Sequence, residues 1–261
     1  MRDTILSHLS GDYPWKDLLQ YYPVTGSTND VLKTLAKQGA PHGTAIVAGQ
    51  QTGGHGRLGR SFHSPEGMGI YLSILLRPGC APTELMHLTC AAAVAAAEAL
   101  PIKCGIKWTN DLVVGKKKLG GILTELSLNP DGSVAWAIIG IGINRSHGTE
   151  DFPPELRDMA TSIALEAGTA PTPSELAASV ILSLKRMSDS LLSGKEAMLR
   201  TYRSRCVTLG KEISILRGEE IRHGTAVDVD EEGALVVRFP DGHREAVSSG
   251  EVSIRGMYGY V

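Results

Sequence analysis

The chain has 261 residues, of which 42% are hydrophobic and 21% charged, and its formal net charge at pH 7 is −2. This length suffices for one large domain or two unequal ones, and the near-neutral charge disfavours a dedicated nucleic-acid-binding protein. No signal peptide is evident, and the longest apolar run, residues 134–143, is too short to span a bilayer. The cysteines form no CxxC pair. We therefore expect a cytoplasmic protein with reduced thiols and no membrane segment.

Up to about residue 208, the apolar periodicity predicts a mixture of helices and strands. Residues 1–23 are too few, and too interrupted by Gly11 and Pro14, for a helix-turn-helix, so no DNA-binding module is expected. Thr172 and Glu175 fit a capping box that opens a helix. Helices are predicted at residues 29–37, 83–100, 172–192 and 195–205, and strands at 44–48, 69–76, 102–108, 112–114, 119–126 and 134–143. The last strand is almost wholly apolar, as expected for a central strand covered on both faces.

Beyond Gly210 the sequence changes to short β-rich runs separated by turn signals at residues 232–233 and 241–242. Such spacing is typical of a small barrel. We expect one domain over residues 1–208 and a second, β-rich domain over residues 209–261. The five predicted strands are residues 212–216, 225–229, 234–239, 244–247 and 252–254.

The densest functional signal is the segment QTGGHGRLGR at residues 51–60. It matches the GxGxxG pattern, but no helix follows it directly, so a Rossmann dinucleotide site is rejected. Its many backbone N–H groups, together with Arg57 and Arg60, suit a phosphate or a carboxylate. The alternative is a mobile surface loop with solvated arginines, and the segment alone does not decide between the two.

The second signal is KWTNDLVVGKKKLGG at residues 107–121, where polar side chains interrupt an apolar pattern. Lys118 leads directly into a strand, where its ammonium group can meet a buried anion. For Lys116 and Lys117 we expect solvated side chains.

Two further segments are weaker signals when each is taken alone. The GSTND sequence at residues 26–30 fits an ordinary helix cap, with Ser27 as the N-cap, or a polar ligand site at a helix N-terminus. The GIGIN sequence at residues 140–144 fits a turn, or a strand end whose glycines admit a flat ligand. His55 and His63 have no cysteine or carboxylate cluster nearby, so no metal site is predicted.

Together and in this order, the motifs GSTN, QTGGHGRLGR, KWTND, KLGG and GIGIN resemble the biotin–protein ligase family, also called biotin–acetyl-CoA-carboxylase ligase. The resemblance extends from about residue 20 to the C-terminus and is to the form without an N-terminal DNA-binding domain. It implies an α+β fold, in which a mixed-sheet catalytic domain precedes a small SH3-like β-barrel. It also implies an enzyme that forms biotinyl-5′-AMP from biotin and MgATP and transfers biotin to a lysine of a biotin carboxyl carrier protein.

The resemblance also implies roles for individual residues. Lys118 and Arg57 would be catalytic and would contact biotin. The other biotin-binding residues would be Ser27, Thr28, Asn29, Gln51, His55 and Gly56, and the nucleotide-binding residues Arg60, Phe62, Lys107, Asn110, Asp111 and Asn144. Three positions depart from the family pattern: His55 replaces an arginine, Phe62 a tryptophan and Thr109 a proline.

Two alternatives remain open at this point. A lipoate or octanoate ligase shares the implied catalytic fold, although such proteins lack the pairing of KWTND with GRLGR. A non-catalytic protein that binds biotin or a nucleotide is the alternative from a different class, and Arg57 and Lys118 argue against it. No DNA or membrane partner is expected, and a homodimer through sheet-edge pairing is left undecided.

Overall fold

The computed structural model describes residues 1–261 except 10, 12, 249–252 and 257–261. Its larger part is built on a seven-stranded sheet with the order β1-β2-β3-β7-β6-β5-β4. Only the pair β1–β2 is parallel within this sheet. Its strands are β1 (Leu19–Thr25), β2 (Ala45–Gln51), β3 (Gly69–Leu76), β4 (Gly105–Lys107), β5 (Asp111–Val114), β6 (Lys117–Leu128) and β7 (Val134–Asn144).

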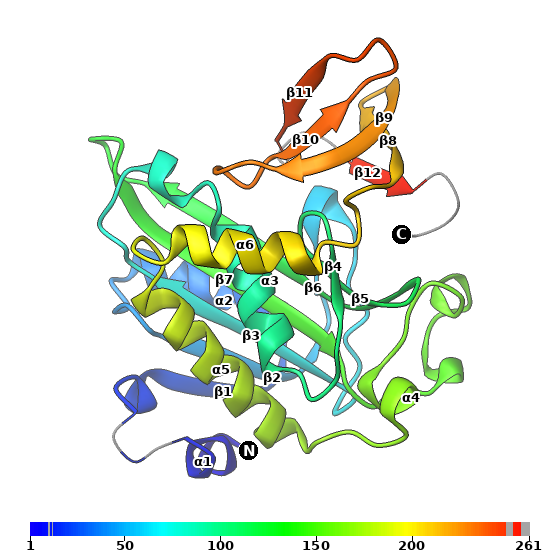
Figure 1. Ribbon diagram of the computed structural model, residues 1–261. Coiled ribbons are helices and arrows are strands. Elements are labelled where there is room, and N and C mark those ends of the chain that lie inside the picture. Colours follow the sequence, from blue (N-terminus) through cyan, green and yellow to red (C-terminus); the bar gives the residue numbers. More distant parts are fainter. Residues whose placement is uncertain (10, 12, 249–252, 257–261) are drawn as a thin grey trace.

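Helices cover both faces of this sheet. Helix α2 (Thr28–Lys37) contacts β2, β3 and β7 on one face, and α3 (Leu88–Ala99) and α5 (Pro173–Asp189) pack on the other. In Figure 1, α5 and α6 (Lys195–Arg205) lie in front of the sheet and α2 lies behind it. Two short helices, α1 (Arg2–Ser7) and α4 (Ile163–Ala167), complete the α-helices of the described residues.

Successive side chains along a strand point to opposite faces of the sheet, so each strand contributes to the hydrophobic core on either face. On β2, Ile46 packs with α2 while the next residue, Val47, joins the larger core on the opposite face. Ile138 and Ile139 of β7 are divided in the same way. This confirms the prediction of a central strand covered on both faces, because a strand with two buried faces reads as one apolar run.

Several predicted elements agree closely with the structure. The strand at residues 69–76 and the helix at residues 195–205 have the predicted bounds. The capping box is confirmed, since the Thr172 backbone N–H donates to Glu175 Oε2 at 2.8 Å and Thr172 Oγ1 accepts from the Glu175 N–H at 3.3 Å. No described helix is long and apolar enough to cross a membrane.

Other predictions are corrected. The helix expected at residues 83–100 is a 3-10 turn, Pro82–Leu85, followed by α3. The strand expected at residues 102–108 shrinks to β4. Strand β1 was not predicted because Pro23 interrupts its apolar pattern. Because β1 is an edge strand, it can accommodate this proline, which need not donate a hydrogen bond to a neighbouring strand.

The C-terminal region forms a five-stranded antiparallel sheet with the order β11-β10-β9-β8-β12. All five strands were predicted, although β9 begins earlier than expected, directly after a tight turn at Gly218. The boundary at residues 208 and 209 stays a prediction. The strands are β8 (Glu212–Arg217), β9 (Glu220–Val229), β10 (Leu235–Arg238), β11 (Arg244–Val247) and β12 (Ser253–Gly256).

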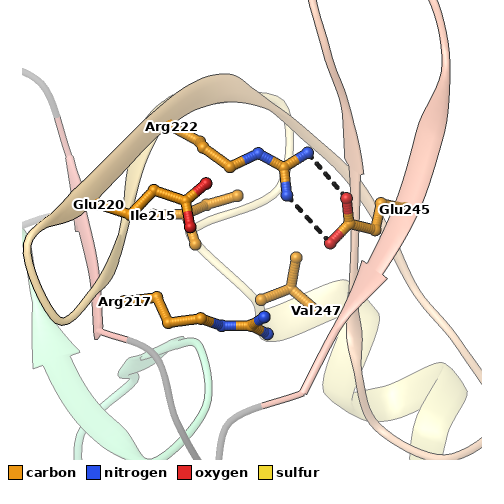
Figure 2. Close-up of a pocket in the computed structure, with 6 residues that line it drawn as sticks. All are labelled: Ile215, Arg217, Glu220, Arg222, Glu245 and Val247. Carbon is orange, nitrogen blue, oxygen red and sulfur yellow. Dashed lines mark hydrogen bonds and ion pairs between the residues drawn. The ribbon is translucent and has the colours of Figure 1, made fainter.

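A forked ion pair links β9 to β11 across the small sheet (Figure 2). Arg222 Nη2 lies 2.7 Å from Glu245 Oε2, and Nη1 lies 3.2 Å from Oε1. The hydrogen bonds from Arg222 hold the pKa of Glu245 below its ordinary value. The pocket beside this pair has a volume of only about 20 Å³. That is room for about one water molecule, so the pocket is too small for an organic ligand.

One turn fastens the small domain to the large one. The Gly233 carbonyl, between β9 and β10, accepts a hydrogen bond from Trp108 Nε1 at 3.0 Å and a weaker one from Cys90 Sγ at 3.8 Å. From α6, Arg203 Nε donates to the Val229 carbonyl at 2.7 Å. The small domain is therefore joined directly to Trp108, immediately after β4.

We expect Gly233→Ala to destabilise the protein by about 1–3 kcal/mol more than Gly242→Ala. Both glycines have a positive φ, +84° and +90°, so both variants carry the left-handed backbone penalty of an L-residue. At Gly233 a Cβ would also lie 3.0 Å from Cys90 Sγ, whereas at Gly242 no described atom lies within 4 Å. Urea denaturation followed by tryptophan fluorescence measures the difference, and equal losses in the two variants would show that the turn is not packed tightly against Cys90.

Candidate functional site

A cavity of about 820 Å³ opens between the glycine-rich loop, the N-terminus of α2 and the adjoining ends of β5, β6 and β7. Every residue that the sequence assigned to the site lines this cavity, although they come from segments far apart in the chain. They are Ser27, Thr28, Asn29, Gln51, His55, Gly56, Arg57, Arg60, Phe62, Lys107, Asn110, Asp111, Lys118 and Asn144. The predicted convergence of these segments is thus present in the structure, while the role of each residue stays a prediction.

One end of the cavity is polar and internally hydrogen-bonded. The backbone N–H of Thr28 donates to Gln51 Oε1 at 2.9 Å, and Gln51 Nε2 donates to Ser64 Oγ at 3.2 Å. Ser27 is the N-cap of α2, but its buried hydroxyl makes no capping hydrogen bond with the described residues. The ordinary helix-cap interpretation of Ser27 is therefore wrong for its side chain.

The glycines of β7 make room for protein side chains. A Cβ at Gly140 would collide with the Asn29 amide, and a Cβ at Gly142 would lie 2.5 Å from the Phe62 ring. The sequence predicted that these glycines admit a flat ligand. In the structure Phe62 occupies the space beside Gly142, because the loop folds back over the sheet.

The glycine-rich loop closes on itself between Gly54 and Phe62. The Phe62 N–H donates to the Gly54 carbonyl at 2.8 Å, and the Gly56 N–H donates to the Arg60 carbonyl at 2.7 Å. Leu58 at the tip has a positive φ of 56° and is 58% exposed. Arg57 and Leu58 both line the cavity, and Leu58 remains largely exposed.

Arg57 and Lys118 both line the cavity, and the carboxylate of Asp111 interacts with the charge of each. Lys118 Nζ lies 2.6 Å from Asp111 Oδ1, and both side chains are partly shielded from solvent. Arg57 Nη1 donates to Asn110 Oδ1 at 3.3 Å. Burial lowers the pKa of Arg57 from its ordinary value, and the Asp111 charge partly offsets this effect. The site thus holds two cations in one cavity, an arrangement suited to a ligand with more than one negative charge.

Backbone pairing sets the position of Lys118. Its N–H donates to the Met159 carbonyl at 2.7 Å, and its carbonyl accepts from the Thr161 N–H at 2.8 Å. The same segment holds Asn144, whose Nδ2 donates to the Thr161 carbonyl at 3.0 Å. The Asn144 amide oxygen is thereby turned away from that carbonyl and can accept from a ligand in the cavity.

The wall formed by residues 152–160 was missed by sequence reasoning. It consists of one 3-10 turn, Pro154–Leu156, and irregular backbone with no chemical motif, and its position depends on pairing with Lys118. Lys116, expected to be solvated, is exposed but lies at the cavity rim. The other lining residues not singled out are Leu58, Ser61, His63, Trp108, Gly121, Ile122, Leu123, Gly140, Ile141, Gly142, Phe152, Leu156, Asp158, Met159 and Ala160.

A buried histidine supports this wall. The His147 ring stacks on Phe152 with centroids 4.8 Å apart, and its two nitrogens have no hydrogen-bond partner among the described residues. Burial lowers the pKa of His147 to about 4, and the nearby His63 contributes in the same direction. The ring is therefore neutral at pH 7 and acts as an aromatic support for Phe152.

Comparison with known proteins gives concordant matches. Residues 21–144 match the model of the biotin/lipoate A/B protein ligase family, and residues 208–255 match that of the biotin protein ligase C-terminal domain. The bifunctional ligase/repressor BirA of Bacillus subtilis is 36% identical over 88% of this chain and 72% of its own length. The biotin–[acetyl-CoA-carboxylase] ligase of Mycobacterium tuberculosis is 29% identical over 97% of this chain and 93% of its own.

A solved structure is similar over nearly the whole chain. It is the biotin protein ligase from Aquifex aeolicus in complex with biotin and ATP, with a TM-score of 0.76 and 31% identity. The match covers 91% of this chain and 98% of that one. The predicted fold, a mixed-sheet domain followed by a small β domain, is thereby confirmed.

We expect acid to destabilise the protein through His147, by on the order of 3 kcal/mol between pH 7 and pH 4. The folded-state pKa of about 4 lies below the ordinary value of 6.5, so the unfolded chain takes up the proton first. This contribution is absent above pH 6.5, grows as the pH falls and levels off below about pH 4. Urea denaturation of the parent and of His147→Leu over this range measures it. Parallel stability curves for the two proteins would contradict the expectation.

Proposed function

The chain belongs to the biotin/lipoate A/B protein ligase family, and from this membership we propose that it is an ATP-dependent biotin–protein ligase. It forms biotinyl-5′-AMP from biotin and MgATP and transfers biotin to a lysine of a biotin carboxyl carrier protein of the acetyl-CoA carboxylase type. One observation carries the proposal. Arg57 and Lys118 converge with a polar, hydrogen-bonded pocket end in a single cavity of about 820 Å³.

The first chemical step requires two anions to approach each other. An oxygen of the biotin carboxylate attacks the α-phosphorus of MgATP, the bond to the bridging oxygen breaks, and pyrophosphate leaves. Repulsion between the carboxylate and the phosphates opposes this approach, so fixed cations at the meeting point lower the barrier. Lys118 and Arg57 supply these cations, and Mg²⁺ enters with the nucleotide as part of the substrate.

In the second step the lysine amine of the carrier attacks the acyl carbon, and AMP leaves with the electrons of the broken C–O bond. The mixed anhydride hydrolyses readily in water, so it has to be shielded until the carrier arrives. The glycine-rich loop lines the cavity, and Leu58 at its tip is exposed. We propose that it closes over the intermediate, with His55 and Gly56 near the biotinyl group.

The two substrates are assigned to opposite parts of the cavity. Ser27, Thr28, Asn29 and Gln51 form the polar end, which suits the ureido ring of biotin because that ring carries both N–H donors and a carbonyl acceptor. The nucleotide lies toward Asn144, whose amide oxygen can accept from an adenine amino group. The remaining nucleotide-side residues are Arg60, Phe62, Lys107, Asn110 and Asp111.

The free cysteines and the named relatives bear on the location and on further roles of the protein. A cytoplasmic location is supported by the four free and buried cysteines, Cys80, Cys90, Cys104 and Cys206, which fit a reducing compartment. A repressor role is not part of the proposal, although relatives such as that of Bacillus subtilis are named ligase/repressors. Lipoate or octanoate ligation remains the second candidate, since the same family model covers it.

Pyrophosphate exchange tests the proposed function. We expect the protein to exchange labelled pyrophosphate into ATP with biotin and not with lipoate. Mass spectrometry of a biotin carboxyl carrier domain, incubated with the protein, ATP and biotin, should then show one biotinyl group on one lysine. Exchange with lipoate alone would make the protein a lipoate ligase, and biotin binding without any exchange would make it a non-catalytic binding protein.

We expect Lys118→Ala to lower biotin-dependent exchange about 10²–10³-fold, the effect of losing one fixed group that stabilises the developing charge. The matched control is Lys117→Ala, which removes the same charge one residue earlier in β6, where the side chain is exposed and absent from the cavity lining. The control should keep its activity within about twofold. Exchange rates with unchanged melting temperatures separate a catalytic effect from unfolding, and equal losses in both variants would remove Lys118 from the mechanism.

A further inference from the structure

A row of hydrogen bonds runs behind the polar end of the cavity and includes two residues that are not part of its lining. Glu125 on β6 accepts from Asn29 Nδ2 at 2.7 Å through its Oε2. Ser73 on β3 is fully buried, and its Oγ lies 2.5 Å from Asn29 Oδ1 and 2.7 Å from Thr28 Oγ1. Thr28 in turn contacts Gln51. Glu125 and Ser73 therefore contact the polar residues from behind.

The chemistry of Glu125 sets the direction of these hydrogen bonds. A carboxylate only accepts, so Asn29 must donate to it through Nδ2 and turn its Oδ1 toward Ser73. An amide oxygen also only accepts, so the short contact with Asn29 Oδ1 uses the single hydrogen of Ser73. The single hydrogen of Thr28 Oγ1 then has two acceptors within reach, Ser73 Oγ at 2.7 Å and Gln51 Oε1 at 3.1 Å.

This direction decides what the cavity offers to a ligand. The second hydrogen on Asn29 Nδ2 is left as a donor, and the second lone pair of Thr28 Oγ1 is left as an acceptor. A reversed Asn29 amide would present an oxygen where the nitrogen now lies. Either orientation of the Asn29 amide fits the same space, since its oxygen and its NH₂ group have nearly the same shape.

We propose that Glu125 and Ser73 are positioning residues for the ureido ring of biotin. By orienting Asn29 and Thr28, they make the polar end offer a donor to the ureido oxygen and an acceptor to a ureido N–H. This inference deepens the proposed function and rests on it. Neither residue is expected to contact biotin or to act in catalysis.

Glu125 also forms an ion pair with Lys33, and the effect of losing this ion pair can be measured separately from the effect on Asn29. Lys33 Nζ lies 2.8 Å from Glu125 Oε1 and 3.0 Å from Asp30 Oδ1, toward solvent. Lys33→Met removes the ion pair but leaves the acceptor-only carboxylate on Asn29. Glu125→Gln keeps the size of the side chain but permits both orientations of Asn29, because a glutamine can either donate or accept.

The experiment measures equilibrium binding of biotin and of 2-iminobiotin, in which a nitrogen replaces the ureido oxygen, to the full chain by calorimetry. For Glu125→Gln we expect the biotin Kd to rise about tenfold, the effect of losing about one net hydrogen bond. The preference for biotin over 2-iminobiotin should shrink by a similar factor. The ATP KM, kcat and the melting temperature should stay within experimental error of the parent values.

Three further variants complete the test. Lys33→Met should change the biotin Kd by less than about threefold. Glu125→Ala also removes the acceptor-only carboxylate, so it should narrow the ligand preference as Glu125→Gln does and replaces that variant if it folds poorly. Ser73→Ala leaves the Glu125 carboxylate on Asn29, so it should narrow the preference less. Equal weakening of both ligands, no weakening, or an effect of Lys33→Met as large as that of Glu125→Gln would overturn the inference. Failure of the parent protein to bind biotin would instead overturn the proposed function, and the inference with it.

Discussion

The structure depends on keeping two cations together inside a cavity before any anion arrives. The charges of Arg57 and Lys118 repel each other, and burial lowers the pKa of Arg57. Asp111 resolves both problems, because its carboxylate lies 2.6 Å from Lys118 and counteracts the lowering of the Arg57 pKa. A close pair of opposite charges at intermediate dielectric is worth about 4 kcal/mol before desolvation. An anionic ligand therefore enters a site whose charges are already in place.

The cavity also depends on the register between β6 and β7. On β7, Gly142 pairs with Gly121 and Gly140 pairs with Leu123, and neither β7 glycine places a side chain on the face that meets Asn29 and Phe62. The freed space is taken by Asn29 from α2 and by Phe62 from the loop. The glycines thus bring the helix N-terminus and the loop close to the strands, which places the polar and the cationic residues around one volume.

The small domain is part of the same arrangement. The Gly233 carbonyl holds the Trp108 indole, and Thr208 Oγ1 accepts from the Trp108 N–H at 2.9 Å. Trp108 lines the cavity between Lys107 and the Asn110–Asp111 pair. Through Gly233, the C-terminal domain therefore supports the segment that carries Asp111.

Most of the helices and strands, and most residues of the candidate site, were predictable from the amino-acid sequence. Local patterns can be recognised in a single sequence. They include the helix cap formed by Thr172 and Glu175, the apolar run of β7 and the motifs around Arg57 and Lys118. The residues that lie behind or opposite these motifs are brought there by contacts between segments far apart in the chain. The wall at residues 152–160 follows from backbone pairing with Lys118, and β1 is held by its edge pairing with β2. Glu125 meets Asn29 across 96 residues. Such contacts depend on strand register and helix placement, which no short stretch of sequence encodes.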